Sequence, residues 1–189
     1  MTAIPSDLFE LSDDHLDVVQ PLIVPAEYGE HDFPAPLARL ADPRLLLTWV
    51  ALARPDWMTY VKPAIAADWR ARGIDLHARA LANMRAADDG LTWTHEKTDD
   101  SGRLVWVAMM HEDGLGSSRL LCHDELAAAF PEGYIVSLPD RSFGLALSAA
   151  ASPDERRAFE AMVRECFDGA TTPMLSDLLP PEALLHHAD

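Results

Sequence analysis

Two short polar stretches of the sequence carry side chains that could do acid–base or metal chemistry. Residues 111–113 read His-Glu-Asp at the end of a predicted strand, and residues 122–125 read Cys-His-Asp-Glu beyond a glycine-containing loop. If the loop folds back on itself, two imidazoles and several carboxylates meet, as a metal site or a general acid–base pair requires. These stretches therefore suggest an enzyme of unassigned class, with or without a divalent metal. Its candidate catalytic residues are His111, Asp113, His123 and Asp124.

The spacing of these residues does not match the established catalytic motifs. Neither H-E-x-x-H nor a paired C-x-x-C occurs, and the Gly-Leu-Gly-Ser-Ser stretch at 114–118 lacks the Gly-Lys-Ser/Thr ending of a phosphate loop. Cys122 and His123 are adjacent, so on a strand their side chains point to opposite faces. The alternative is a solvated polar loop in which Asp124 caps a helix. We therefore assign no catalytic residue, no metal ligand and no cofactor, and favour a non-enzymatic protein.

Three pairs of apolar runs predict β-hairpins around these polar stretches. The paired runs are 44–53 with 57–61, 91–98 with 103–110, and 134–138 with 143–147. Each pair is separated by a polar turn containing Pro or Gly, and Asp99-Asp100-Ser101-Gly102 is the clearest of these turns.

Helices are predicted between and after the hairpins, over 64–72, 75–87, 124–130 and 153–168. Ser152 and Glu155 have the spacing of a capping box at the start of the last helix. His77 lies on the apolar stripe of the second helix and is expected to be a half-buried core histidine. Together the elements predict an α+β fold, with antiparallel hairpins forming a sheet and helices packed mainly on one face.

The 189 residues fit one globular domain, because 49% are hydrophobic and no low-complexity tract occurs. Residues 1–42 form an acidic segment punctuated by proline, with a short helix over 7–19 and then an extended stretch expected to wrap the surface. Residues 43–170 form the core, and residues 171–189 are a leucine-rich tail.

The central part of the chain carries a family resemblance. A strand pair ending in Tyr60-Val61 leads into a helix containing Ala80, Leu81, Asn83 and Met84, and the later stretch GYIVSLPDRSFGLALS contains two strands around a Pro-x-Arg turn. This pattern, over about residues 45–148, resembles the YtpQ-like family of bacterial proteins of unknown function. The resemblance implies an α+β fold and a bacterial cytoplasmic setting. It implies no catalytic residue, since the family has no established reaction.

The charge of the chain bears on its partners. The formal net charge is -16, and it divides into -8 for residues 1–42, +1 for 43–110 and -9 for 111–189. A surface this negative disfavours nucleic acid and anionic membranes, because both are bound mainly through Lys and Arg. It favours a basic protein partner, for example a toxin neutralised by an immunity protein. The predicted partner-binding residues are Glu27, Glu30 and Asp32.

The expected compartment is the cytoplasm. The first residues lack the basic and apolar regions of a secretory signal, and the longest apolar stretch, at 45–53, is far shorter than the ~20 residues that span a bilayer. Only two cysteines occur, which suits a reducing environment better than a disulfide framework. No oligomeric state is predicted.

Overall fold

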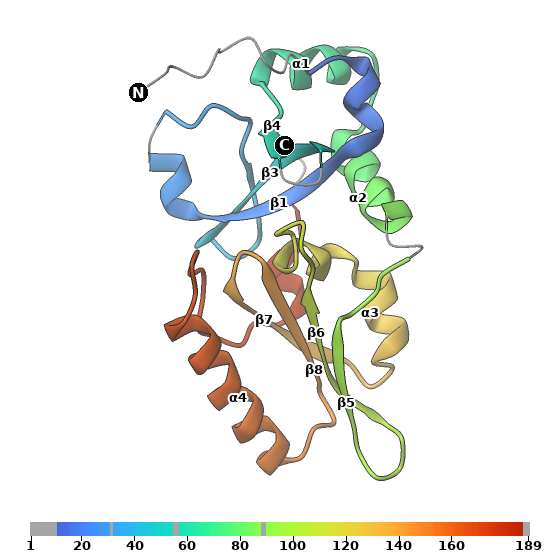
Figure 1. The fold of residues 1–189 in the computed structure, drawn as a ribbon, viewed down its shortest axis with the longest axis vertical. Coiled ribbons are helices and arrows are strands. Elements are labelled where there is room, and N and C mark those ends of the chain that lie inside the picture. The colour runs from blue at the N-terminus through green and yellow to red at the C-terminus, as the bar shows by residue number, and fades with distance from the viewer. Residues whose placement is uncertain (1–10, 31, 55–56, 88–89, 187–189) are drawn as a thin grey trace.

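Eight strands form two antiparallel four-stranded sheets in this computed structural model, which describes residues 11–30, 32–54, 57–87 and 90–186. The N-terminal sheet lies above the C-terminal sheet in Figure 1. The first sheet consists of β1 (Val19–Pro25), β2 (Ala38–Arg39), β3 (Leu45–Arg54) and β4 (Trp57–Tyr60). The second consists of β5 (His95–Thr98), β6 (Leu104–Met110), β7 (Tyr134–Asp140) and β8 (Phe143–Ser148).

Strand β3 is the centre of the first sheet. Strand β1 pairs along one side of it, from Val19 opposite Ala51 to Pro25 opposite Leu45, while β2 and β4 share the other side. The expectation that the proline-punctuated stretch after residue 19 wraps the surface is wrong, because Leu22 and Ile23 in β1 are fully buried. Proline is tolerated in β1 because the strand hydrogen-bonds to a neighbour on one side only.

The short helix predicted over 7–19 falls partly outside the described residues. The part that is described forms a single 3-10 helix, η1 (Asp13–Val18). Three further 3-10 helices follow in the described chain: η2 (Ala26–Glu30), η3 (Ser117–Leu121) and η4 (Pro181–Leu184).

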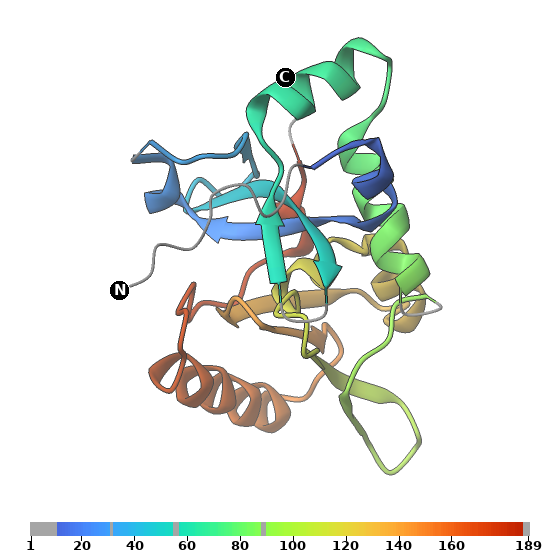
Figure 2. The same cartoon turned by 45° about the horizontal axis from the view of Figure 1, so that its top comes forward.

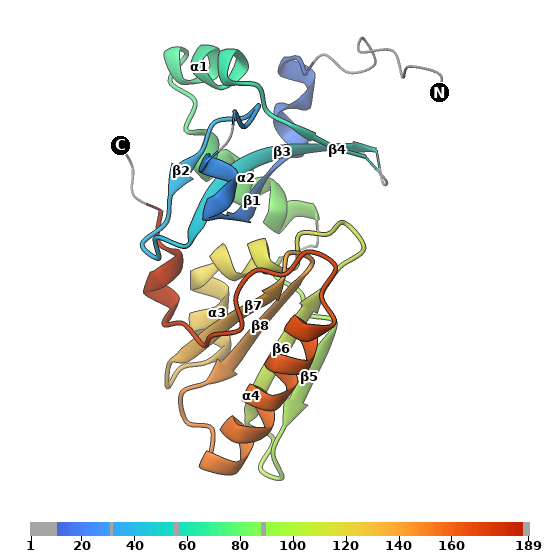
Figure 3. The same cartoon turned by 90° about the vertical axis from the view of Figure 1, so that its left-hand side faces the viewer.

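Helices cover both faces of the second sheet, whose strand order is β5-β6-β8-β7. The four α-helices of the described residues are α1 (Pro63–Ala71), α2 (Leu76–Ala87), α3 (His123–Ala129) and α4 (Pro153–Asp168). Phe159 and Val163 of α4 pack against one face, with Leu145 and Leu147 of β8. Leu126 of α3 belongs to the core cluster on the other face, and Figure 3 shows α3 and α4 on opposite sides of the sheet. No helix within the described ranges is both long enough and apolar enough to cross a membrane.

The α+β fold built from antiparallel hairpins, predicted from the sequence, is confirmed. The hairpins β3–β4, β5–β6 and β7–β8 all form, although they are divided between two sheets. The capping box of α4 also forms: Ser152 Oγ accepts from Glu155 N at 3.3 Å, and Glu155 Oε2 accepts from Ser152 N at 2.7 Å. Local turn and cap chemistry is sufficient to specify these elements.

One cluster of buried side chains joins the two sheets, since it contains Leu47 and Trp49 of the first and Val107 and Val136 of the second. The C-terminal segment adds a second connection. Val136 N donates to Leu179 O at 2.8 Å on β7, and Asp42 N donates to Ala183 O at 2.8 Å beside β2. Figure 2 shows this red segment passing from the second sheet to the first. The acidic N-terminal region and the leucine-rich tail therefore pack together.

Candidate functional site

The two polar stretches that could form a catalytic cluster end up with different neighbours. His111 follows β6, and its Nε2 lies 3.2 Å from the carbonyl oxygen of Thr92. His123 begins α3, and its Nδ1 lies 3.2 Å from the hydroxyl of Tyr134. Burial lowers the pKa of His123, although Asp124 and Glu182 oppose that effect. The two imidazoles therefore have separate hydrogen-bonding partners.

Strand register shows that the two histidines lie at opposite ends of the second sheet. Met110, next to His111, pairs with Phe143 at the start of β8, whereas Tyr134, the partner of His123, pairs with Ser148 at its end. Five residues of strand separate these positions, about 17 Å at ~3.4 Å per residue. The predicted meeting of His111 and His123 does not occur. Among the described residues, no group of three or more His, Cys, Asp or Glu side chains could hold a metal ion.

Asp113 is held by a buried ion pair. Its carboxylate accepts from Arg119 Nη1 at 3.0 Å and Nη2 at 2.8 Å, and Oδ1 also accepts from Leu115 N at 2.9 Å. The side chain of Arg119 is only 1% exposed. Burial alone would raise the pKa of Asp113, but the hydrogen bonds from Arg119 and Leu115 outweigh it and hold the pKa below its usual value. This carboxylate stabilises the loop, and His111 lies near enough to add to the lowering of its pKa.

Asp124 is exposed in the first turn of α3 and does not cap the helix as expected. The helix begins one residue earlier than predicted, with Cys122 at the N-cap position. A carboxylate in the first turn still stabilises the helix, because it lies near the positive end of the helix dipole. His111, Asp113, His123 and Asp124 thus do not converge on one site.

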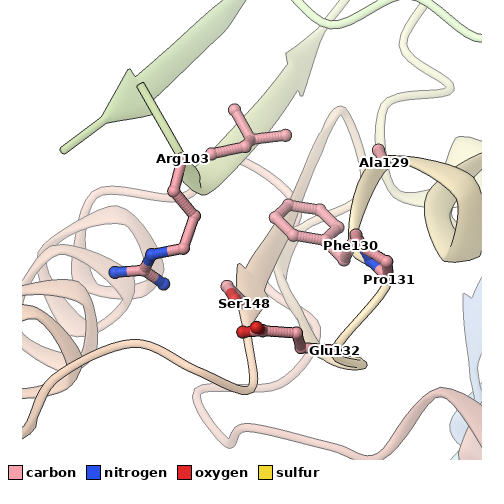
Figure 4. A pocket seen from close by; sticks show the side chains of 7 residues that line it. Arg103, Ala129, Phe130, Pro131, Glu132 and Ser148 are labelled. Carbon is pink, nitrogen blue, oxygen red and sulfur yellow. The ribbon is translucent and has the colours of Figure 1, made fainter. Parts of the chain in front are cut away.

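A cavity of about 240 Å³ lies between the start of β6 and the end of α3, with Arg103 on one side and Phe130, Glu132 and Ser148 on the other (Figure 4). The guanidinium of Arg103 is held by two carboxylates. Its Nε donates to Asp99 at 2.9 Å, and its Nη2 lies 3.6 Å from Glu155. These two carboxylates neutralise the positive charge of Arg103, which an anionic ligand in the cavity would otherwise bind.

The predicted partner-binding residues lie on the surface around η2. Glu27, Glu30 and Asp32 are all exposed, and none of them forms an ion pair with a described residue. The other carboxylates of this N-terminal region with described side chains are paired. Asp13 binds Arg72, Asp17 binds Arg79, and Asp42 binds Arg44. Among the described carboxylates of this region, the ones without an ion pair are therefore those of Glu27, Glu30 and Asp32.

Three half-buried aromatic rings lie beside these carboxylates. Tyr28 and Phe33 have ring centroids 5.1 Å apart at 69°, and Phe33 and Tyr60 have centroids 5.0 Å apart at 77°. Burial raises the pKa of Tyr60, with Tyr28 adding to the effect and Arg141 opposing it, so the phenol stays protonated at neutral pH. We call the six residues the acidic–aromatic surface: Glu27, Tyr28, Glu30, Asp32, Phe33 and Tyr60.

The aromatic half of this surface was not predicted. Tyr28 and Phe33 alternate with the acids along the chain, but Tyr60 comes from β4, and only folding brings it against Phe33. The alternation of acidic and aromatic residues over 27–33 was the sequence signal that could have indicated it.

Comparison of the chain with family models, with curated proteins and with solved structures finds no match. The resemblance of residues 45–148 to the YtpQ-like family therefore stays a prediction.

Proposed function

We propose that this protein is a non-enzymatic module that binds a basic protein partner through the acidic–aromatic surface. One case of such a pair is a protein toxin and the immunity protein that neutralises it. The observation that carries the proposal is the placement of three unpaired carboxylates around three partly exposed aromatic rings. We propose the cytoplasm as the compartment, in keeping with a chain that has only two cysteines.

The two components of the surface support different parts of binding. Partly buried aromatic side chains serve as anchors, since tyrosine and other large rings supply contact area at a low cost in side-chain entropy. The edge-to-face contacts hold Phe33 between Tyr28 and Tyr60, so the rings are ordered before a partner arrives. Exposed carboxylates at the rim accelerate encounter with a cationic surface and select against acidic partners.

Charge pairing inside the molecule engages several other acids, and the aromatic rings set Glu27, Glu30 and Asp32 apart from the acids that remain unpaired elsewhere. Bases of the nearly neutral middle segment compensate acids of both flanks, as in Arg72 with Asp13, Arg85 with Glu125 and Arg44 with Asp177. A carboxylate that already has a guanidinium partner is less available to a lysine or arginine of another protein. The carboxylates at 27, 30 and 32 have no such competition within the described chain.

The proposal predicts that removing charge at this surface slows association with a basic partner. A basic protein captured by the immobilised chain from its host lysate is purified, and association rates are measured by surface plasmon resonance from low to physiological salt. In the triple variant Glu27→Gln, Glu30→Gln, Asp32→Asn, the low-salt association rate is expected to fall about tenfold and its salt dependence to flatten.

A matched control separates this surface from overall charge. The variant Glu112→Gln, Glu165→Gln, Asp168→Asn removes the same charge from three other exposed positions that form no ion pair with a described residue. It is expected to change the rate less than about twofold. Phe33→Ala, once shown by its thermal midpoint to be folded, is expected to weaken binding about 30-fold, or ~2 kcal/mol. Equal losses in both triple variants, or no salt-sensitive basic partner, would contradict the proposal.

A further inference from the structure

The last described part of the C-terminal segment, residues 180–186, is attached to the first sheet beside β2. Two backbone amides of the first sheet's side, Ala41 N and Asp42 N, donate to carbonyl oxygens of this stretch at 3.0 and 2.8 Å. His186 also forms an isolated antiparallel bridge with Leu40. The attachment is therefore short, and it is separate from the hydrogen bonds that hold the four strands of the first sheet together.

The ring of His186 contacts two other aromatic rings at this attachment. Its centroid lies 4.7 Å from that of His77 in α2, with planes tilted by 40°, and 6.3 Å from that of Trp49 in β3, at 88°. The centroids of Trp49 and His77 are 6.5 Å apart at 76°. The three rings line a pocket of about 410 Å³, together with Arg70 of α1. Docking of the C-terminal stretch thus places two imidazoles side by side.

The surroundings of His77 favour its neutral form. Its Nδ1 is buried and has no hydrogen-bond partner in the part of the chain that the structure describes. Burial lowers the pKa of His77 to about 4, with His186 and His123 adding to the effect and Asp75 opposing it. Arg70 is a further cation in the lining of the pocket. One carboxylate therefore faces a permanent cation and two other histidines, which is too little to stabilise a protonated His77.

The burial of the packed elements indicates which of them gives way when His77 gains a proton. A buried charge is relieved when water reaches it. Helix α2 is fixed by Ala80 and Met84, which are fully buried, and β3 is the central strand of its sheet. Within residues 180–186, by contrast, Leu184 is the single buried side chain. Segments with few buried contacts open at a lower free-energy cost than core elements, so this stretch opens first.

We propose that residues 180–186 form an acid-sensitive strap, which is released from the first sheet when His77 is protonated beside His186. Release separates the two imidazoles and admits water to His77. It also uncovers Trp49 and the backbone of residues 40–42. The inference goes beyond the proposed function, because it concerns the chain alone and needs no partner. Either proposal can therefore fail without the other.

The test is native-state hydrogen exchange of the ¹⁵N-labelled full chain, followed by NMR. The amides of Ala41 and Asp42 are the reporters, since both donate to carbonyls of the strap. The pKa of His77 is lowered from 6.5 to about 4 by docking, so docking is strongest above pH 6.5 and weakens as the pH falls toward 4. Between pH 7 and pH 5, the ratio of docked to released chains falls about 20-fold. The protection factors of both amides, corrected for the intrinsic exchange rate, are expected to fall by that factor.

Paired histidine variants assign the effect to His77. In His77→Phe and His77→Gln, which carry no titrating ring there, the fall is expected to be less than about threefold. His95→Phe removes an exposed histidine of β5 and is expected to keep the full fall. The amides of β8 are expected to stay more protected than the two reporters at pH 5, which shows release without global unfolding. No fall in the wild type, an equal fall in the His77 variants, or equal protection of β8 and the reporters overturns the proposal.

Discussion

Replacing Gly116 with alanine is expected to destabilise the protein by more than about 3 kcal/mol, because an added Cβ meets closer contacts here than at any other glycine of the chain. A Cβ at this position would lie 2.0 Å from the carbonyl oxygen of Ser142 and 2.2 Å from that of Met109. Both obstacles are backbone atoms, which cannot move aside as a side-chain end can. Urea unfolding followed by tryptophan fluorescence measures the loss.

The surrounding contacts explain why the backbone cannot retreat from the added methyl group. Ser117, the next residue, is fully buried, and its Oγ donates to Asp140 O at 2.6 Å. Gly144 on β8 lies on the other side of the same close backbone contact, since a Cβ there would lie 2.5 Å from Gly116 O. The loop before η3 is thus held against the β7–β8 hairpin, and glycine permits the close approach.

Gly114→Ala is the matched control, two residues away in the same loop. Gly114 has a φ of 72°, but no heavy atom lies within 4 Å of the position that a Cβ would take, so its cost comes from backbone conformation alone. That cost is about 1 kcal/mol. Gly116 has an ordinary helical conformation, with φ of -53°, so its cost is steric. Equal stabilities of the two variants would contradict the prediction that the close backbone contact at Gly116 restrains the loop.

Replacing Asp113 with alanine is expected to cost about 3–5 kcal/mol, because it leaves the guanidinium of Arg119 buried without this carboxylate. Glu112→Ala, at the neighbouring exposed position, is expected to cost less than about 0.5 kcal/mol. Thermal and urea unfolding of both variants at pH 7 measure the difference. A double-mutant cycle with Arg119→Met then isolates the coupling of the pair. Similar stabilities for the two single variants would contradict the importance of the pair.

The same pair predicts a pH dependence with a definite sign. The hydrogen bonds from Arg119 and Leu115 overcome the effect of burial and lower the pKa of Asp113 below 3.8 in the folded state. A carboxylate with a lowered folded pKa contributes stability that is fully present above its unfolded pKa and is lost as the pH falls through the folded pKa. The wild type is therefore expected to lose more stability than Asp113→Ala below about pH 4.

The predicted catalytic loop shows how far spacing along the chain can mislead. Residues 111 and 123 are twelve positions apart, a distance that allows a loop to fold back on itself. Instead Gly116 and Ser117 hold the intervening segment against the β7–β8 hairpin, and η3 then leads to His123 at the far end of the sheet. Asp113 is used to neutralise a buried arginine, a role that depends on where Arg119 lies after folding.

The strands and helices that were predicted correctly depend on neighbours close in the chain. The Asp99 carboxylate accepts from Ser101 N and Arg103 N within its own turn, and Ser152 caps α4 through Glu155. By contrast, the burial of β1 was missed. Its prolines indicate an exposed segment, and only its pairing with β3 and its position at an edge make a buried strand possible.

By itself, the sequence determined the α+β class, the three hairpins, the capping box of α4 and the acidic character of residues 27–32, because each follows from composition or from contacts within a few residues. The tertiary structure alone decided that the hairpins form two sheets, that arginines of the middle segment compensate acids of both flanks, and that Tyr60 joins Tyr28 and Phe33. It also assembled Trp49, His77 and His186 into one pocket. These features depend on contacts between residues far apart in the chain, whose pairing is set by how the whole core packs and not by any local pattern.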